Sequence, residues 1–306
     1  MLHLIDRLDR HLGGAERVVL GLTTHLPRDR FEVWVCTTRF AGGPPMEALA
    51  SAGVTHVHLD RSTSRRAVAP FRDLVSVLRR ERFDVLHSHM FGSNVWGTLF
   101  GTLCRVPVVI AHEHTWSYEG EPLRKFLDGR FVGRLATTFV AVSTRDRDRM
   151  IAVEKVPPGK IVVIPNAYVP RPDDDVGDLR AELGIPPGVP LVASVAVFRP
   201  QKALDVLVDA FAILLEAVPD AHLLLVGGGK CKPAVEQQVE RLGLTARVHM
   251  PGRREDVASV WAAADLAAMS SDFEGMPLAA IEALEHGVPL VATNVGGLPD
   301  IVGDGK

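Results

Sequence analysis

Short apolar runs alternate with amphipathic segments from one end of this 306-residue chain to the other. The runs are rich in Val and Ile and are bounded by Gly, Pro, Asp or Asn, which is typical of buried strands. The segments between them, such as AERVVLGLTTHL and FRDLVSVLRRER, carry apolar residues at helical spacing. Because successive parallel strands are joined by crossover helices, this alternation predicts mostly parallel sheets covered on both faces.

The alternation predicts a series of strands in each half of the chain. Those of the first half are Leu2–Asp6, Phe31–Thr37, Thr55–Leu59, Asp84–His89, Val106–Ala111, Thr138–Ser143 and Ile161–Ile164. Those of the second half lie in PLVASVAVF, HLLLVGG, RVHMPG, ADLAAMS and PLVATN. Between the halves, PNAYVPRPDDDVGD breaks the pattern with prolines and an acid run, as a linker does. We therefore expect two doubly wound α/β domains, 1–165 and 179–306, joined by a linker over 166–178.

Composition excludes some classes of function. Lys+Arg of 34 against Asp+Glu of 37 gives a net charge of -3, which argues against nucleic-acid binding. No apolar run approaches the ~20 residues of a membrane helix, and MLHLIDRLDRHLGG does not read as a signal peptide. Cys36, Cys104 and Cys231 form no CxxC pair, so we expect reduced thiols in a cytoplasmic protein.

The stretch SSDFEGMPLAAIEAL places Glu274 in a Gly-Pro turn and Glu282 within the helix that follows. Pro277 suits the first helical position, because its missing N–H would have no partner there. The segment Gly275–Leu278 would then form a helix N-terminus, which favours a phosphate group. The two carboxylates would reach hydroxyls at either end of a sugar–phosphate–ribose ligand. The alternative is that Glu282 is one exposed helix residue, as Glu285 is expected to be.

The segment FEGMPLAAIEALEHGVPLVATNVGGLPDIV resembles the E-x7-E segment of retaining glycosyltransferases of family 4. The resemblance implies the GT-B fold, in which two Rossmann-like domains face each other across a cleft. It implies transfer of a sugar from a nucleotide-diphosphate donor to a hydroxyl acceptor. In that arrangement Glu274 contacts the donor sugar and Glu282 holds the ribose. The diphosphate is taken up by the segment of Gly275, Met276, Pro277 and Leu278.

Other segments extend the resemblance over nearly the whole chain. IDRLDRHLGGAERVVLGL resembles the first strand, Gly-Gly loop and helix of the family, and glycines at 13 and 14 would let backbone approach a ligand. A simple loop geometry is the alternative for Gly13 and Gly14. In FDVLHSHMFGSN, His89 matches a family histidine at the end of a strand, which implies that it positions donor hydroxyls. A surface or satisfied core histidine is the alternative.

Metal sites are not expected. His87, His89, His112 and His114 show no tight ligand spacing and no carboxylate partner. The acid run at 173–175 lies in the linker, where no strand orients its carboxylates toward a shared ion. We therefore expect these side chains to be solvated. The resembled family needs no bound metal for transfer, which implies no cofactor beyond the nucleotide sugar as co-substrate.

The chain departs from the family pattern in SVAVFRPQKALDVL. Lys202 matches the diphosphate-binding lysine, but Val197 stands at the usual arginine and Ala203 at the usual glycine. Arg199 lies two residues on and either reaches the same phosphate or points elsewhere. The chain also stops at IVGDGK where relatives continue, so we expect the second domain to be incomplete at its end. These departures keep open an alternative: a catalytically impaired nucleotide-sugar-binding or assembly-partner protein on the same fold.

Two other enzyme classes are disfavoured by the motifs of the sequence. A sugar-nucleotide epimerase of similar fold is disfavoured by the Gly-Gly start together with E-x7-E, and an oxidoreductase by the missing glycine fingerprint. LLLVGGGKCKP is not a Walker motif. In the resembled family such glycines lie beside the donor-binding cleft, which implies a weak binding role for Gly227 and Gly228. Seven arginines fall from Arg61 to Arg82 around an apolar stripe. That stripe either packs on its own sheet or makes peripheral contact with the inner face of a membrane. The family implies a glycan, lipid-linked or small-molecule acceptor.

Overall fold

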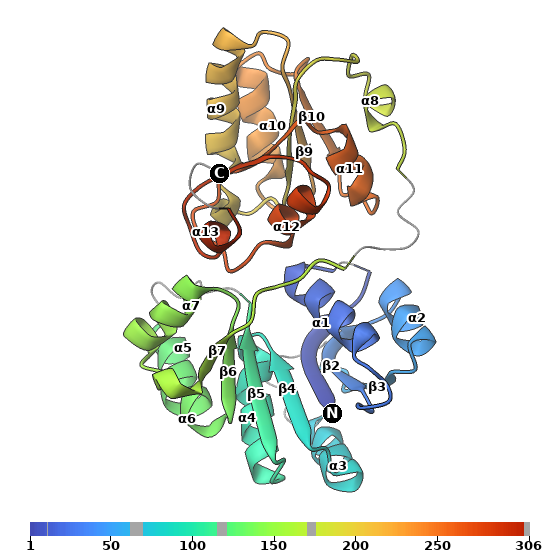
Figure 1. Cartoon of the computed structure of the whole chain (residues 1–306), viewed down its shortest axis with the longest axis vertical. Coiled ribbons are helices and arrows are strands. Elements are labelled where there is room, and N and C mark those ends of the chain that lie inside the picture. The colour runs from blue at the N-terminus through green and yellow to red at the C-terminus, as the bar shows by residue number, and fades with distance from the viewer. Residues whose placement is uncertain (11, 62–69, 115–120, 170–175, 303–306) are drawn as a thin grey trace. The chain divides into compact units, whose positions relative to one another are not determined.

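The computed structural model describes residues 1–10, 12–61, 70–114, 121–169 and 176–302. It divides into two compact units, Met1–Ala167 and Tyr168–Lys306 (Figure 1). The division falls within the linker expected over 166–178. Each unit holds one all-parallel sheet with helices between its strands, so the predicted α/β class with two Rossmann-like domains is confirmed. The acid run at 173–175 lies outside the described residues.

The sheet of unit 1 has seven strands in the order β3-β2-β1-β4-β5-β6-β7. Its strands are β1 (Leu2–Leu8), β2 (Trp34–Ala41), β3 (Thr55–His58), β4 (Val85–His89), β5 (Val108–Glu113), β6 (Thr138–Ala141) and β7 (Ile161–Val163). All overlap the predicted runs. β2 begins three residues late because the amide of Phe31 still bonds to the Pro27 carbonyl, at 3.0 Å. The first bond to β1 is that of the Trp34 amide to the Met1 carbonyl, at 2.9 Å.

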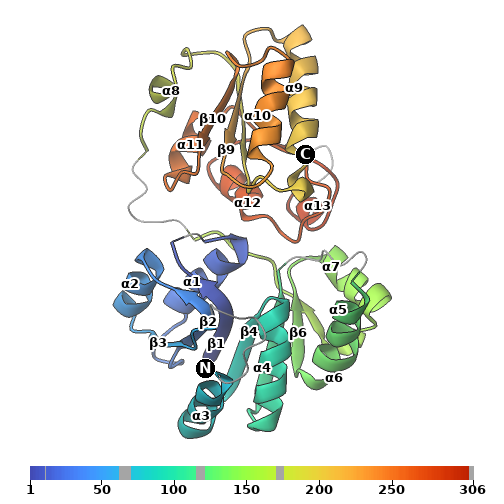
Figure 2. The same cartoon turned by 180° about the vertical axis from the view of Figure 1, so that it is seen from behind.

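Helices cover both faces of this sheet. They are α1 (Gly14–His25), α2 (Pro44–Ser51), α3 (Phe71–Glu81), α4 (Phe91–Leu103), α5 (Pro122–Phe126), η1 (Leu127–Val132), α6 (Gly133–Leu135), α7 (Thr144–Arg149), η2 (Met150–Glu154) and η3 (Pro158–Lys160). Successive residues of β1 belong to two different hydrophobic cores. Leu4 packs with α3, whereas Ile5 packs with α1 and α2. Figure 2 shows α4 lying over the face of the sheet turned away in Figure 1.

The apolar stripe of the arginine-rich segment packs into the core of unit 1. Phe71, Leu74 and Leu78 of α3 are at most 2 % exposed and join the core beneath β1 and β4. The arginines at 79 and 80 stay exposed on the opposite side. α3 is therefore a crossover helix on its own sheet, and its apolar face is not available to a membrane. Among the described residues, no helix combines the length and the apolar character needed to cross a bilayer.

The sheet of unit 2 has five strands in the order β10-β9-β8-β11-β12. They are β8 (Leu191–Val195), β9 (His222–Val226), β10 (Val248–Gly252), β11 (Leu266–Met269) and β12 (Leu290–Ala292). The helical elements are α8 (Leu179–Glu182), η4 (Pro200–Lys202), α9 (Leu204–Ala217), α10 (Lys232–Arg241), α11 (Val257–Ala263), α12 (Leu278–Glu285) and α13 (Leu298–Ile301). α9 and α10 pack on one face of the sheet, and α8, α11 and α12 contribute to the core of the other.

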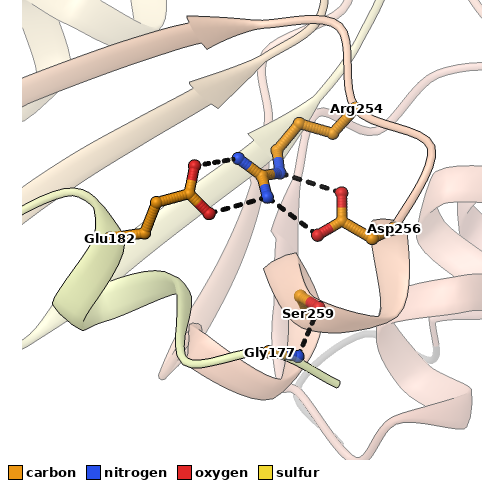
Figure 3. A network of polar contacts seen from close by, with 5 residues as sticks. All are labelled: Gly177, Glu182, Arg254, Asp256 and Ser259. Carbon is orange, nitrogen blue, oxygen red and sulfur yellow. Dashed lines mark hydrogen bonds and ion pairs between the residues drawn. The ribbon is translucent and has the colours of Figure 1, made fainter. Parts of the chain in front are cut away.

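The Arg254 side chain ties α8, near the start of unit 2, to the loop before α11 (Figure 3). The Arg254 guanidinium donates to both carboxylate oxygens of Glu182, at 2.6 and 2.9 Å, and to both of Asp256, at 2.8 and 2.9 Å. These bonds raise the pKa of Arg254 above its usual value. The Gly177 amide also donates to Ser259 Oγ at 3.0 Å. The chain entering unit 2 is thus held to the loop before α11 and to α11 itself.

Candidate functional site

The sheet order locates a ligand-binding edge in unit 2. β9 follows β8 on one side and β11 lies on the other, so the winding direction reverses between β8 and β11. Open α/β sheets bind ligands outside the carboxyl ends of their strands at such a switch point. Lys202 lies in η4, after β8, and Glu274 follows β11. The fold thus brings these two predicted site residues together across 72 positions of sequence.

The Glu274 carboxylate is buried and doubly bonded. It is 4 % exposed, and its Oε1 forms a close ion pair with Lys202 Nζ and accepts a hydrogen bond from Ser271 Oγ at 2.6 Å. Ser271 is itself 2 % exposed, whereas the Lys202 side chain is 17 % exposed. Because a buried charge is tolerated when it is paired and hydrogen bonded, this arrangement holds a carboxylate and an ammonium at one edge of the sheet.

The loops that carry this pair are bonded to each other. The Asp272 amide donates to the Gln201 carbonyl at 2.9 Å, and Gln201 Nε2 donates to the Phe273 carbonyl at 2.9 Å. Ser270 Oγ donates to the Lys202 carbonyl at 2.9 Å. We did not single out the two serines from sequence. The feature of the sequence that could have identified them is the Ser-Ser pair between an apolar run and the Glu-Gly turn.

The helix after Glu274 begins at Leu278, one residue later than predicted. Pro277 is its N-cap, with an extended backbone at φ -72° and ψ 124°. The proline therefore lies just outside the helix instead of at its first position. Gly275, Met276 and Leu278 are buried beside Glu274. Their contact with a diphosphate stays a prediction.

A third loop closes over the backbone of Glu274. Gly296 follows β12 and has a left-handed φ of +53°, and a Cβ built on it would lie 1.9 Å from the Glu274 carbonyl oxygen. The hydroxyl of Thr293 donates to the Ser271 carbonyl at 2.6 Å. The loop after β12 therefore packs on the backbone of the segment that carries Glu274, and the loop after β8 supplies the ion-pair partner of its carboxylate.

Glu282 lies on α12 and is 2 % exposed, whereas Glu285 on the same helix is exposed. The alternative that Glu282 is one exposed helix residue is therefore wrong. A glutamate so deeply buried in a helix is uncommon. Its predicted role with the ribose stays a prediction.

The departures from the family pattern have clear local structures. Arg199 is exposed, and its carbonyl accepts from the Lys202 amide at 3.0 Å. Val197 is half-buried. Ala203 adopts the left-handed conformation, with φ 42° and ψ 46°, at the position where the family has glycine. The left-handed backbone conformation that favours glycine is therefore present here, although alanine replaces the glycine. Phosphate binding by Arg199 stays a prediction.

We predict that Ala203→Gly changes the free energy of unfolding by less than about 0.5 kcal/mol, because opposing effects offset. Relief of the left-handed strain stabilises by about 1–2 kcal/mol, whereas the lost methyl and the freer unfolded chain cost a similar amount. The control Ala283→Gly, at a fully buried helical position, is expected to cost about 1.5–2 kcal/mol. Urea unfolding measures both, and equal losses would contradict the strain at Ala203.

The glycines after β9 have a packing role. A Cβ on Gly227 would lie 1.9 Å from the Ala196 carbonyl oxygen, and one on Gly229 would lie 2.4 Å from that of Phe198. The Phe198 amide bonds to the Gly228 carbonyl at 3.0 Å. The glycines therefore let this loop lie directly against the backbone that follows β8.

In unit 1 the winding reverses between β1 and β4. Gly13 is the N-cap of α1, which follows β1, and Gly14 is its first residue. Gly14 is exposed, and a Cβ on it would meet no atom of the described residues within 4 Å. A Cβ on Gly13 would meet the flexible carboxylate of Glu16, at 2.7 Å. Backbone conformation does not demand glycine at either position, so open space at Gly14 is the feature that suits close approach of a ligand.

Five histidines gather on one face of this sheet. They are His3 of β1, His87 and His89 of β4, His112 of β5 and His114 just beyond it, and each is at most 9 % exposed. Burial lowers the pKa of all five, that of His87 to about 4 and that of His114 to about 3, so the rings are neutral at pH 7. The expectation of no tight ligand spacing is wrong, because groups of three ring nitrogens lie within 4.8 Å of one another.

His89 sits at the centre of this cluster and is 0 % exposed. Its Nε2 lies 3.1 Å from His3 Nδ1, and its Nδ1 lies 3.2 Å from His114 Nε2. Contact with a donor sugar would require one of these neighbours to move. The predicted donor role of His89 stays a prediction, and the geometry favours a role within the cluster. His3 was missed from sequence, because one histidine near a chain start carries no spacing signal.

Asp128 lies in a buried acidic group of unit 1. It is 1 % exposed, with Glu113 and Glu154 near it at 7 % and 4 %. Burial first, and then the two glutamates, raise the pKa of Asp128 to about 9, while Arg124 acts in the opposite direction. The folded state therefore keeps a proton that the unfolded chain releases above a pKa of about 3.9.

We expect Asp128→Asn to raise the melting temperature at pH 8 and to flatten its pH dependence. Because the folded pKa is raised, the stabilising proton is fully present below pH 4 and is lost as the pH rises through about 9. An amide copies the neutral carboxyl without that loss, and each kcal/mol gained corresponds to about 2–4 °C. Thermal unfolding from pH 5 to pH 9 is the measurement, with the exposed Asp29→Asn as control. A larger gain at pH 5 than at pH 8 would refute the protonation state.

Comparison with known proteins agrees with this architecture. Residues 12–170 match the family model described as Glycosyltransferase Family 4, and residues 175–306 match that of Glycosyl transferases group 1. The D-inositol 3-phosphate glycosyltransferase of Nocardia farcinica is 33% identical, over 96% of this chain and 72% of that protein. The UDP-Gal:alpha-D-GlcNAc-diphosphoundecaprenol alpha-1,3-galactosyltransferase of Escherichia coli is 25% identical, over 94% of this chain and 77% of that protein.

Solved structures share the fold. Anabaena Alr3699/HepE in complex with UDP-glucose has a TM-score of 0.82 at 22% identity, covering 98% of this chain and 82% of that one. WaaG, a glycosyltransferase of lipopolysaccharide biosynthesis, has a TM-score of 0.72 at 19% identity, covering 99% and 84%. With matching family models along both units and relatives aligned over nearly its whole length, this chain belongs to the family 4 glycosyltransferases of GT-B fold and is a glycosyltransferase.

Proposed function

We propose that this glycosyltransferase moves a sugar from a nucleotide-diphosphate sugar to a hydroxyl acceptor and retains the configuration of the anomeric carbon. The observation that carries the proposal is the buried contact between Lys202 and Glu274 at the switch point of unit 2. In this contact the cation proposed to bind the diphosphate lies beside the anion proposed to face the sugar. The name of one relative, which includes UDP-Gal, and that of a similar structure in complex with UDP-glucose support the donor class.

The proposed chemistry is a substitution at the anomeric carbon. The bond from this carbon to the diphosphate breaks while the bond to the acceptor oxygen forms on the same face. The acceptor proton passes to the departing phosphate oxygen, so no protein nucleophile is needed. Lys202 stabilises the negative charge that grows on the diphosphate, and Glu274 supports the positive charge that develops on the sugar.

Lys202 and Glu274 form an ion pair with each other. We propose that the donor diphosphate draws the ammonium away and frees an oxygen of Glu274 for the sugar. Ser271 would hold the carboxylate in place during this exchange, because its hydroxyl donates to the same Oε1. The backbone from Gly275 to Leu278 and the side chain of Arg199 would supply further phosphate contacts.

Glu282 and the start of unit 1 complete the proposed binding set. Glu282 would hold the ribose, and Gly13 and Gly14 would face the acceptor or the donor diphosphate. A lipid-linked acceptor and contact with the inner face of a membrane are proposed by analogy with the diphosphoundecaprenol in the name of the Escherichia coli relative. Transfer itself would need no cofactor beyond the donor. The impaired-binder alternative is not favoured, since the relatives are named as transferases.

A donor screen tests this proposal. UDP-, GDP- and ADP-sugars are compared for their effect on the melting temperature, because a ligand bound to the folded state raises it. The donor found is then incubated with candidate hydroxyl acceptors, and the anomeric configuration of the product is read by NMR. We expect stabilisation by one nucleotide class and a retained anomer. An inverted product, or no stabilisation by any nucleotide sugar, would contradict the proposal.

Gly14→Leu is expected to lower kcat/KM by at least about tenfold while leaving the melting temperature nearly unchanged. The new side chain would enter space that is open among the described residues, since none of them lies within 4 Å of a Cβ there. Any loss would therefore report a ligand that needs this space. The control is Gly159→Leu, also open and placed in η3. Equal activities of both variants would show that no ligand approaches Gly14.

A further inference from the structure

The histidine cluster of unit 1 is not needed by the proposed transfer chemistry. Its side chains come from three neighbouring strands, because β1, β4 and β5 are adjacent in the sheet. His-x-His occurs twice, at 87 and 89 and at 112 and 114, and alternate residues of a strand share a face. In the parallel register His89 lies opposite His112. The sheet thus stacks two such pairs side by side.

Three of these rings form a compact group at the carboxyl edge of the strands. His89 ends β4, His112 lies in β5 and His114 follows it, and their ring nitrogens all lie within 4.8 Å of one another. His89 Nδ1 and His114 Nε2 are 3.2 Å apart. A tetrahedral zinc ion with Zn–N bonds of about 2.0–2.1 Å holds its nitrogens roughly 3.3 Å apart. One edge of that tetrahedron is therefore already present.

The other two histidines orient the group. His3 Nδ1 lies 3.1 Å from His89 Nε2, and His87 Nε2 lies 3.3 Å from His112 Nδ1. These contacts leave His89 Nδ1 and His112 Nε2 for a ligand, and His112 Nε2 is buried with no hydrogen-bond partner in the described part of the chain. Metal-binding histidines almost always donate their second ring N–H to a carboxylate, a backbone carbonyl or water, and here a neighbouring imidazole takes that place for His89 and His112.

We propose that His89, His112 and His114 bind one divalent transition-metal ion of the zinc type, with His3 and His87 as outer partners that fix the ring orientations. Imidazole nitrogens suit Zn²⁺, Co²⁺ and Ni²⁺, whereas Mg²⁺ and Ca²⁺ take oxygen ligands. A second group, His3, His87 and His89, shares His89. We assign the ion to the first group, because it lies at the strand ends where ligands enter a parallel sheet. Three nitrogens leave a fourth tetrahedral position for water.

Metal binding by the chelator-treated whole chain tests this site. Co²⁺ is added while visible absorption is followed, and we expect saturation at one ion per chain with the bands of a tetrahedral nitrogen site. Zn²⁺ should displace the Co²⁺ and raise the melting temperature. His112→Ala and His114→Ala should each weaken binding at least tenfold, and His87→Ala by about 10–100-fold. The control is His249→Ala, from the His222–His249 pair of unit 2, whose ring nitrogens are 2.8 Å apart.

Two results would overturn the site: no saturable binding by the unaltered chain, or binding that His112→Ala and His114→Ala leave unchanged. Because such variants are open to misfolding, X-ray absorption of the Zn²⁺-loaded natural chain gives an independent answer. We expect three imidazole nitrogens at about 2.0–2.1 Å, and a shell of oxygens alone would refute the assignment. The readouts are metal binding and coordination, so they are independent of whether sugar transfer follows the proposed route.

Discussion

Glu274→Gln and Lys202→Ala are each expected to lower turnover by about 10²–10³-fold, the loss typical of removing one charge-stabilising group. Both side chains lie in one buried ion pair at the switch point of unit 2. Without Lys202 the charge that grows on the diphosphate loses its cation, and without the Glu274 charge the developing positive sugar loses its anion. Initial rates at saturating donor, with the product measured directly, check both variants.

Stability must be separated from chemistry in this test. Removing one partner of a buried pair leaves a buried charge and costs up to about 3–5 kcal/mol, less here because Lys202 is partly exposed. The double variant Glu274→Gln with Lys202→Met removes both charges, so it should be more stable than Lys202→Ala yet equally inactive. Lys232→Ala, from the surface pair of Lys232 with Glu236, is the matched control. Near-normal turnover in either single variant would refute the assigned roles.

Gly296→Ala is expected to destabilise the chain by more than about 3 kcal/mol and to abolish transfer. The new methyl would lie 1.9 Å from the Glu274 carbonyl oxygen and 2.6 Å from its carbon, so backbone must move. That movement displaces the residue on which the proposed chemistry depends. Chemical unfolding and the transfer rate are the two measurements.

Gly287→Ala is the matched control for this substitution. Gly287 has a φ of +73°, also left-handed, but a Cβ there meets no atom within 4 Å in the part of the chain that the structure describes. It should therefore cost only the conformational penalty of about 1–2 kcal/mol. Equal losses in the two variants would show that crowding over Glu274 adds nothing.

The sequence by itself determined the fold class and the positions of the strands. Every predicted run overlaps an observed strand, because burial within a parallel sheet demands continuous apolar segments whose composition is a local property. Lys202 was identified by its match to the family lysine, and Glu274 by the Gly-Pro turn before a predicted helix together with the resemblance to the family segment. The offset at Pro277 shows the limit of this reasoning. A proline is accepted both at a cap and at the first helical position, and neighbouring contacts decide between them.

Tertiary structure alone decided which of these segments meet. The contact of Lys202 with Glu274 depends on β8 and β11 being neighbours, and the crowding at Gly296 depends on a third loop reaching the same place. The histidine cluster arises in the same way: alternation puts His87 with His89 on one face, but only the order β1-β4-β5 adds His3 and His112. Strand order follows from packing between distant elements, which no short window of residues encodes.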